Sequence, residues 1–256
     1  MPIDTLKQND YKCVELIQNP DREPRIVKRY SGHPEPNLLE NTRYIYRALD
    51  FFYDAFKDIL VSPRPISIDL NRHQVEMEYL PNLQSAKRLT LLTAIRADSF
   101  FDRCYEIVDN RGFLRTIHDS VILTPKLNKL LSDDFPVALG FKGDLRENLV
   151  SFDDSLILAD IDSICIEPLG LSELILHAEL YASFNLFKTL SASMSGLPFP
   201  RAFFLLSKLQ REQISHAAVE VVSSKMHQHL QLTRYVKCRI ANYFLSRVSN
   251  SKSLSS

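Results

Sequence analysis

Residues 137–162 restrict the fold more than any other part of the chain, because three short apolar runs alternate there with polar turns. The first run, 137–139, leads into a polar loop. The second and third runs, 149–152 and 156–159, are separated by an Asp-Asp-Ser sequence. Turn-forming residues between two short apolar runs are typical of a β-hairpin. We therefore predict a strand, a polar loop and a hairpin, in that order.

Oxygen-bearing side chains lie at the ends of these runs. Asp144 and Asn148 are in the polar loop, and Asp160 and Asp162 follow the third run. When the hairpin folds back on itself, Asp160 comes close to Asp144 and Asn148. Carboxylate and carboxamide oxygens suit Mg²⁺, which takes few protein ligands and keeps phosphate oxygens in its shell. The pattern indicates a magnesium site, and the alternative is a surface hairpin whose acidic residues only form turns.

This arrangement resembles the catalytic and metal-binding loops of the protein-kinase-like fold, in the aminoglycoside phosphotransferase and choline kinase family. The family pattern is HGDLxxxN, followed after a strand by I-D-F/W-D/E, and the matching residues are Gly143, Asp144, Asn148, Asp160 and Asp162. The resemblance implies an α+β, two-lobed fold with a small, mainly β N-lobe and a larger, mainly helical C-lobe. It also implies that Asp144 is the catalytic residue that orients the substrate hydroxyl. Asn148 and Asp160 would then hold the metal that is bound to the nucleotide phosphates.

The chain departs from the family pattern in the loop and in its glycines. Lys142 stands where the family has histidine, and Asn148 follows Asp144 by four positions rather than five. None of the six glycines precedes Lys28, so the glycine-rich phosphate loop of many kinases is missing from the sequence. These departures leave open that the protein is a non-catalytic kinase-like interaction module.

The N-terminal part of the chain contains a second candidate for nucleotide binding. Residues 11–17 and 25–30 are β-prone runs joined by the turn-rich linker 18–24, which predicts a hairpin. Lys28 shares one face of the second strand with two apolar neighbours, because side chains alternate along a strand. The family resemblance implies that Lys28 reaches the nucleotide phosphates. A lysine at a sheet edge is the alternative.

A helix is predicted after this hairpin, because apolar residues recur at near-helical spacing behind a Pro-Glu-Pro-Asn start signal. The apolar positions are Leu38, Ile45, Leu49, Phe52 and Phe56. Glu40 lies in the first turns of this helix and is assigned to the nucleotide site as the partner of Lys28. A surface ion pair with Arg43 or Arg47 is the alternative, since both lie close to Glu40 on the helix.

Two more alternating runs, within residues 66–70 and 75–79, predict another hairpin. Its last residues, Met77, Glu78 and Tyr79, resemble the segment that joins the two kinase lobes and binds the adenine edge of the nucleotide. We therefore expect an N-lobe over residues 1–80, a C-lobe over 81–248 and a disordered tail over 249–256.

The C-lobe is predicted to be mostly helical. Helical patterns cover residues 85–131, 171–190 and 201–248, whereas residues 166–170 (Ile-Glu-Pro-Leu-Gly) are expected to break the chain.

The composition excludes several classes of protein. Of the 256 residues, 45% are hydrophobic and 24% charged, as in globular proteins, and 31 basic residues balance 31 acidic ones. A net basic field for nucleic acid is therefore absent. No apolar run approaches the roughly 18 residues of a membrane span. The N-terminus lacks the basic start and apolar core of a secretory signal, so we expect a cytoplasmic protein.

Together these observations predict an ATP-dependent phosphotransferase with ATP and Mg²⁺ as cofactors. It would transfer the γ-phosphate to a hydroxyl of a small molecule of the aminoglycoside, sugar or amino-alcohol type. A kinase that acts on protein is a further alternative, opposed by the compact N-lobe and the short segment after Asp162. No motif in the C-lobe identifies the acceptor.

Overall fold

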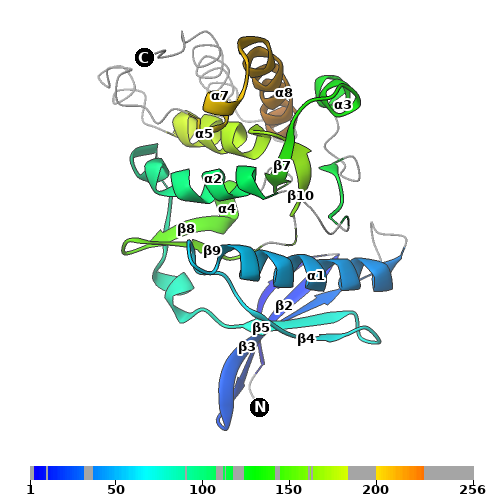
Figure 1. Ribbon diagram of the computed structural model, residues 1–256. Coiled ribbons are helices and arrows are strands. Elements are labelled where there is room, and N and C mark those ends of the chain that lie inside the picture. The colour runs from blue at the N-terminus through cyan, green and yellow to red at the C-terminus, as the bar shows by residue number, and fades with distance from the viewer. Residues whose placement is uncertain are drawn as a thin grey trace. The chain divides into compact units, whose positions relative to one another are not determined.

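The structure is a computed structural model that describes residues 3–9, 11–31, 37–89, 91–107, 112, 114–117, 124–141, 145–160, 162, 164–183 and 200–227. The chain forms two compact units. The first comprises Met1–Lys87 and Val150–Asp162, and the second comprises Arg88–Leu149 and Ser163–Ser256. The first unit is mainly antiparallel sheet and the second mainly helical, so the predicted α+β class is confirmed (Figure 1).

A five-stranded antiparallel sheet forms the centre of the first unit, with strand order β1-β2-β3-β5-β4. Its strands are β1 (Ile3–Gln8), β2 (Lys12–Asn19), β3 (Arg22–Tyr30), β4 (Pro65–Asp69) and β5 (Gln74–Glu78). Both predicted hairpins are present, and β1 is an additional strand that the sequence patterns did not indicate.

The linker predicted over residues 18–24 is wrong in length, because most of it belongs to β2 and β3. The chain reverses at Pro20 and Asp21, and the register shifts between Ile17 and Asn19. Pro24 falls within this irregular stretch, where two residues of β3 oppose one residue of β2. Such a bulge is one of the few places where a strand accepts proline, because proline has no N–H to donate.

Helix α1 (Leu38–Phe56) follows the sheet hairpin as the sequence predicted. Its N-cap is Asn37, whose side-chain oxygen accepts a hydrogen bond from the Glu40 amide at 3.2 Å. The helix lies along the sheet and contacts β4 and β5 (Figure 1). Its most deeply buried residues, Leu49, Phe52 and Phe56, are among the apolar positions that predicted it.

The predicted hairpin is confirmed as β8 (Leu149–Phe152) and β9 (Ser155–Leu158), which form a three-stranded sheet with the short β6 (Lys87–Arg88). Asp153 adopts a φ of 49° in the connecting turn, a left-handed conformation that aspartate tolerates better than most residues. The Val61 amide donates to the Leu156 carbonyl, and the Leu158 amide donates to the Val61 carbonyl. These two bonds fasten the hairpin to the first unit and fix the position from which Asp160 extends.

The second unit is built on the strand pair β7 (Val137–Gly140) and β10 (Cys165–Pro168). The chain break expected at residues 166–170 is therefore wrong for residues 166–168, which belong to β10. Gly140 is required at this pair, because an added Cβ would lie 1.9 Å from the Glu167 side chain. Glu167 in turn accepts hydrogen bonds from the amide and hydroxyl of Ser172 at 2.6 and 2.9 Å. These contacts fix the end of β10 against the helix that follows.

Helices make up most of the rest of the chain that the structure describes. They are the 3₁₀ helices η1 (Pro81–Ser85) and η2 (Leu91–Ala97) and the α-helices α2 (Asp98–Glu106), α3 (Pro125–Ser132), α4 (Leu145–Asn148), α5 (Leu171–Ser183), α7 (Ala202–Leu205) and α8 (Lys208–His227).

The helices are shorter and more broken than the sequence patterns predicted. The pattern over residues 85–131 contains several separate elements, and the one over 201–248 is interrupted between α7 and α8. The remainder of the predicted last helix and the tail 249–256 lie outside the described residues. No described helix combines the length and apolar character needed to cross a membrane.

Two buried titratable side chains on α5 have opposite effects on stability. His177 has no hydrogen-bond partner among the described residues, and burial lowers its pKa to about 4. Burial raises the pKa of Glu173 to about 7, although Tyr105 and the amides of Arg201 and Ala202 donate to its carboxylate. As pH falls from about 6.5 to about 4, His177 binds a proton only in the unfolded chain and destabilises the fold. Glu173 has the opposite effect between about pH 7 and 4.5, so the two contributions offset each other.

Replacing His177 with leucine should remove the destabilising contribution of His177 at acid pH and leave the contribution of Glu173. We expect the His177→Leu protein to gain free energy of unfolding relative to the wild type as pH falls from 6.5 to 4. The gain approaches about 3 kcal/mol at the acid end, since one proton over one pH unit is worth about 1.4 kcal/mol. Urea unfolding at a series of pH values measures it, with the exposed His216→Leu as control. Parallel wild-type and His177→Leu profiles would contradict the assignment.

Candidate functional site

One face of the first unit's sheet carries both apolar and charged side chains. Directly paired residues of antiparallel strands lie on the same face. The pairs on this face include Lys12 with Tyr30 and Lys28 with both Val14 and Val75. Val14 and Val75 are buried, and Lys28 itself is only 3% exposed. A buried ammonium group among apolar neighbours needs a counter-charge, because an isolated buried charge is very costly.

Two aspartates beyond the end of β9 provide that counter-charge. Lys28 Nζ donates to Asp160 Oδ1 at 2.7 Å and to Asp162 Oδ1 at 2.8 Å. Lys12 Nζ donates to the other oxygens of the same carboxylates, at 2.7 Å to Asp160 and 2.9 Å to Asp162. The Tyr30 hydroxyl also donates to Asp162 Oδ2 at 3.0 Å. We call these five residues the Lys–Asp cluster; all of them belong to the first unit.

The electrostatics of the Lys–Asp cluster favour its charged state. Burial opposes ionisation of Asp160, but Lys28 and Lys12 outweigh it and hold the pKa of this carboxyl well below its usual range. Burial likewise opposes the charged form of Lys12, but Asp162 and Asp160 raise its pKa above the ordinary lysine value. The pKa of Tyr30 is also raised, by burial and by Asp162, so its hydroxyl keeps its proton and remains a donor. Two ammonium groups and two carboxylates give the cluster a formal charge of zero.

The donor set of this cluster fits Mg²⁺ bound together with phosphate. Asp160 and Asp162 provide hard carboxylate oxygens, the ligand type that Mg²⁺ prefers. Among the described residues, no three His, Cys, Asp or Glu side chains lie close enough to hold a metal ion. This small number of protein ligands suits a magnesium ion that takes its other ligands from nucleotide phosphates and water. Lys12 and Lys28 would repel a bare cation but attract phosphate oxygens.

The structure brings together two of the residues that the sequence assigned to the site, Lys28 and Asp160. They lie on segments separated by 132 positions and meet at 2.7 Å. Lys28 is also in a central strand rather than at a sheet edge, because β3 is paired on both sides. The Lys28 side chain is therefore buried in the first unit, as the interpretation of an inward-facing lysine requires.

The predicted partnership of Glu40 with Lys28 is wrong in this structure. Glu40 Oε1 instead lies 2.9 Å from Arg43 on the same helix, and the two side chains are 52% and 47% exposed. The physical reason is that Arg43 lies one turn away, whereas both ion-pair contacts of Lys28 go to Asp160 and Asp162. Glu40 has no place in the Lys–Asp cluster.

Met77, Glu78 and Tyr79 lie at the end of β5, the strand that pairs with both β3 and β4. Met77 is buried, with 1% of its surface exposed. The Glu78 amide donates to the Arg64 carbonyl at 2.9 Å, so an adenine contact by this N–H would have to replace that bond. Tyr79 follows the last residue of β5. The adenine contact itself stays a prediction.

Of the remaining two predicted site residues, the structure describes only Asn148, which belongs to the second unit. Asn148 is the last residue of α4 and directly precedes β8. Asp144 lies outside the described residues, as does Lys142. The convergence of Asp144 and Asn148 with Asp160 stays a prediction.

Sequence reasoning missed Lys12 and Tyr30 as members of the cluster, and it matched Asp162 to the family pattern without giving it a role. A signal for Lys12 existed, because it alternates with Val14 and Leu16 on β2 just as Lys28 alternates with apolar residues on β3. A second lysine on an apolar strand face predicts a second acidic partner. The identity of that partner could not be inferred, since 148 and 150 positions separate Lys12 from Asp160 and Asp162.

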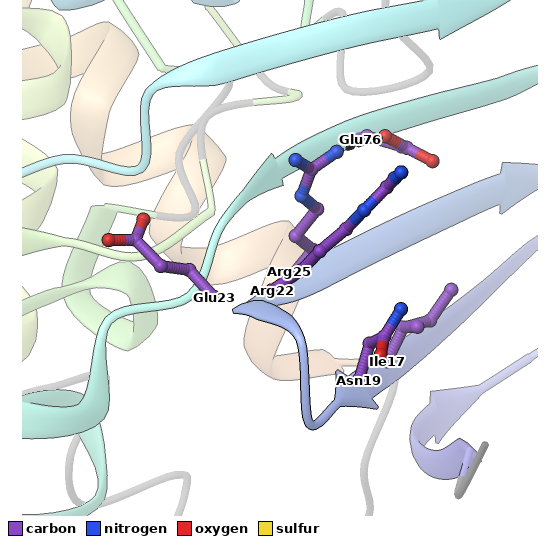
Figure 2. Close-up of a pocket in the computed structure, with 6 residues that line it drawn as sticks. All are labelled: Ile17, Asn19, Arg22, Glu23, Arg25 and Glu76. Atoms are coloured by element: carbon purple, nitrogen blue, oxygen red, sulfur yellow. Dashed lines mark hydrogen bonds and ion pairs between the residues drawn. The ribbon is translucent and has the colours of Figure 1, made fainter.

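A separate pocket lies near the β2–β3 turn. It is lined by Ile17, Asn19, Arg22, Glu23, Arg25 and Glu76 (Figure 2). Arg25 and Glu76 form an ion pair at 3.2 Å with both side chains 34% exposed, whereas Glu23 points away from them (Figure 2). Exposed pairs of this kind contribute about 0–1 kcal/mol. The pocket lacks the buried, mutually paired charges of the Lys–Asp cluster, which is therefore the stronger candidate site.

Comparison with solved structures identifies the fold. A microcompartment-associated aminopropanol kinase matches with a TM-score of 0.55 and 14% identity, over 98% of this chain and 94% of that chain. The streptomycin–ATP–APH(2'')-IIa ternary complex matches with a TM-score of 0.55 and 11% identity, over 89% and 84%. The amicoumacin kinase hAmiN, in complex with AMP-PNP, Ca²⁺ and Ami, matches with a TM-score of 0.54 and 12% identity, over 97% and 88%.

These likenesses show that the chain has the two-lobed protein-kinase-like fold, as the sequence predicted. No protein-family model and no curated protein matches the sequence.

Proposed function

We propose that the protein is an ATP-dependent phosphotransferase that moves the γ-phosphate to a hydroxyl of a small molecule. The observation that carries the proposal is the contact between Lys28 Nζ and Asp160 Oδ1 in a protein-kinase-like fold. The first of these residues matches the lysine that contacts nucleotide phosphates, and the second matches the aspartate that holds the metal. The solved structures include a complex with streptomycin and an aminopropanol kinase, which supports an acceptor of the aminoglycoside, sugar or amino-alcohol type.

Each proposed site residue has a separate role. Lys28 binds and orients the nucleotide phosphates, and Asp160 and Asn148 hold Mg²⁺. When bound, Mg²⁺ neutralises negative charge on the phosphates. Asp144 accepts a hydrogen bond from the acceptor hydroxyl and aligns its oxygen with the γ-phosphate. Little covalent chemistry is required of the protein, so positioning and charge neutralisation account for most of the rate.

Thermal stabilisation by nucleotide tests the proposal without knowledge of the acceptor. ATP with Mg²⁺ at about 100 times its Kd should add about 2.7 kcal/mol to the free energy of unfolding, because the ligand binds only the folded protein. ATP with EDTA should add less, and adenosine with Mg²⁺ little, since it lacks the phosphates that Lys28 and the metal would hold. Differential scanning fluorimetry over a nucleotide series measures these differences.

A non-catalytic interaction module is the second candidate, and it is favoured by the occupation of both carboxylates by lysine. All four oxygens of Asp160 and Asp162 already accept hydrogen bonds from Lys12 or Lys28. In such a module the cluster would only hold the sheet and hairpin together. Absence of any stabilisation by Mg²⁺–ATP, in a protein that is folded and monodisperse, would favour this candidate over the enzyme.

A further inference from the structure

Lys12 is the one cationic member of the Lys–Asp cluster to which the proposed reaction gives no role. Its ammonium group contacts Asp160 Oδ2 and Asp162 Oδ2 together, at 2.7 and 2.9 Å. Lys28 does not contact these Oδ2 atoms, because its own contacts are to the Oδ1 atoms of both residues. Carboxylate oxygens of this kind are the ligands that Mg²⁺ would take from the protein. Lys12 Nζ therefore occupies carboxylate oxygens that a metal at this site would need.

The two lysines differ in how firmly the fold holds them. The Lys28 side chain is 4% exposed and lies in the central strand β3. The Lys12 side chain is 13% exposed, and Lys12 is the first residue of β2, at the end that faces β1 in the chain order. Lysine has a long, flexible stem, so Lys12 can move its ammonium group without displacing the strand. Lys12 is thus the cation that can leave.

We propose that Lys12 is a displaceable counter-ion that keeps bare divalent cations off Asp160 and Asp162, so that metal enters together with a polyphosphate. This inference rests on the proposed function. With Lys12 in place, the cluster is formally neutral and its carboxylate oxygens are occupied. A bare cation therefore gains little binding free energy there. Phosphate oxygens give the Lys12 ammonium group new partners, and the carboxylate oxygens that it leaves become available to the metal. Lys12 is a positioning and selectivity residue that makes metal binding depend on nucleotide.

Removing the charge of Lys12 should increase affinity for free metal. We expect Lys12→Gln to bind Mn²⁺, in the absence of nucleotide, about tenfold more tightly than the wild type, because one positive charge next to the carboxylates is lost. Lys12→Arg keeps the charge and should exclude Mn²⁺ as the wild type does. Lys57→Gln makes the same change at an exposed position of the first unit and is the matched control. Free Mn²⁺ is counted by electron paramagnetic resonance during titration.

Thermal unfolding gives a second readout that does not depend on activity. In EDTA, Lys12→Gln should melt below the wild type, since two carboxylates then share one lysine. Mn²⁺ should restore the melting temperature of this variant and leave that of the wild type nearly unchanged. If the variant does not fold in EDTA, refolding with Mn²⁺ should recover it.

The outcomes separate this inference from the proposed function. Equal Mn²⁺ affinity of Lys12→Gln and wild type, or a variant that stays unfolded in saturating Mn²⁺, would overturn the role of Lys12. In that case nucleotide could still stabilise the wild type, and the phosphotransferase proposal would stand. A different outcome is that Lys12→Gln binds Mn²⁺ more tightly but neither protein binds nucleotide. That outcome would support competition between Lys12 and metal and would contradict the proposed phosphotransferase function.

Discussion

Lys28→Met should lower the free energy of unfolding by about 3–5 kcal/mol, the cost of removing one partner from a buried ion pair. The side chain that is lost is 4% exposed and bonds to two carboxylates that are themselves only 24% and 17% exposed. Lys12 alone would then face two negative charges. Methionine keeps most of the aliphatic volume, so the loss reports on charge rather than on packing. Urea denaturation at neutral pH measures the difference.

Two further variants show whether the loss comes from the ion cluster. Lys57→Met replaces a lysine that is 56% exposed and should change stability little. The double variant Lys28→Met with Asp162→Asn removes one charge of each sign, so it should be more stable than Lys28→Met alone. Additive losses in the double variant would show that Lys28 and Asp162 do not stabilise each other, contrary to their 2.8 Å contact.

Asp160→Asn and Asp144→Asn should affect different steps of the proposed reaction. Asp160→Asn removes a metal ligand, so binding of Mg²⁺–ATP should weaken by at least about 100-fold, the upper end of the loss that follows mutation of a residue that only supports a metal ligand. Asp144→Asn should leave that binding within about twofold of the wild type. It should instead lower the transfer rate by about 10²–10⁴, because a hydroxyl-orienting carboxylate acts mainly in the transition state.

The measurements are nucleotide titration calorimetry and turnover of ATP by each variant. Asp54→Asn provides the matched control, since this aspartate is 58% exposed and pairs only locally with Lys57. Melting temperatures in EDTA identify any variant that has simply lost stability. Equal loss of nucleotide binding in Asp144→Asn and Asp160→Asn would contradict the division of roles between a binding aspartate and a catalytic one.

Local patterns in the sequence were enough to predict the elements that carry the site. The alternation around Lys28 placed it on the apolar face of a strand, and the two apolar runs around the Asp-Asp-Ser turn predicted the hairpin that precedes Asp160. Both inferences rest on the two-residue period of a strand and on turn chemistry, which act within a few residues. Helix α1 was predicted for the same kind of reason, through its cap and its apolar spacing.

Predictions failed where two local rules competed or where a pairing partner was distant. Residues 166–170 were predicted to break the chain because they contain Pro168 and Gly170, yet pairing with β7 keeps the first three of them extended in β10. Glu40 seemed a partner for Lys28, but Arg43 one helical turn away was nearer. A distant pairing partner therefore decided the first outcome, and a local i,i+3 contact, which the sequence offered as the alternative, decided the second.

The sequence by itself determined that Lys28 faces an apolar layer and that Asp160 stands at the end of a hairpin. Only the tertiary structure decided that Lys12 joins them and that Asp162 pairs with both lysines, because Lys12 and Asp162 are 150 positions apart and no local period links them. The physical reason is that burying Lys28 and Lys12 on an apolar face requires an equal negative charge. That charge comes from whichever segment the fold brings next to β2 and β3, and here it is the end of the hairpin that the backbone bonds of Val61 hold in place.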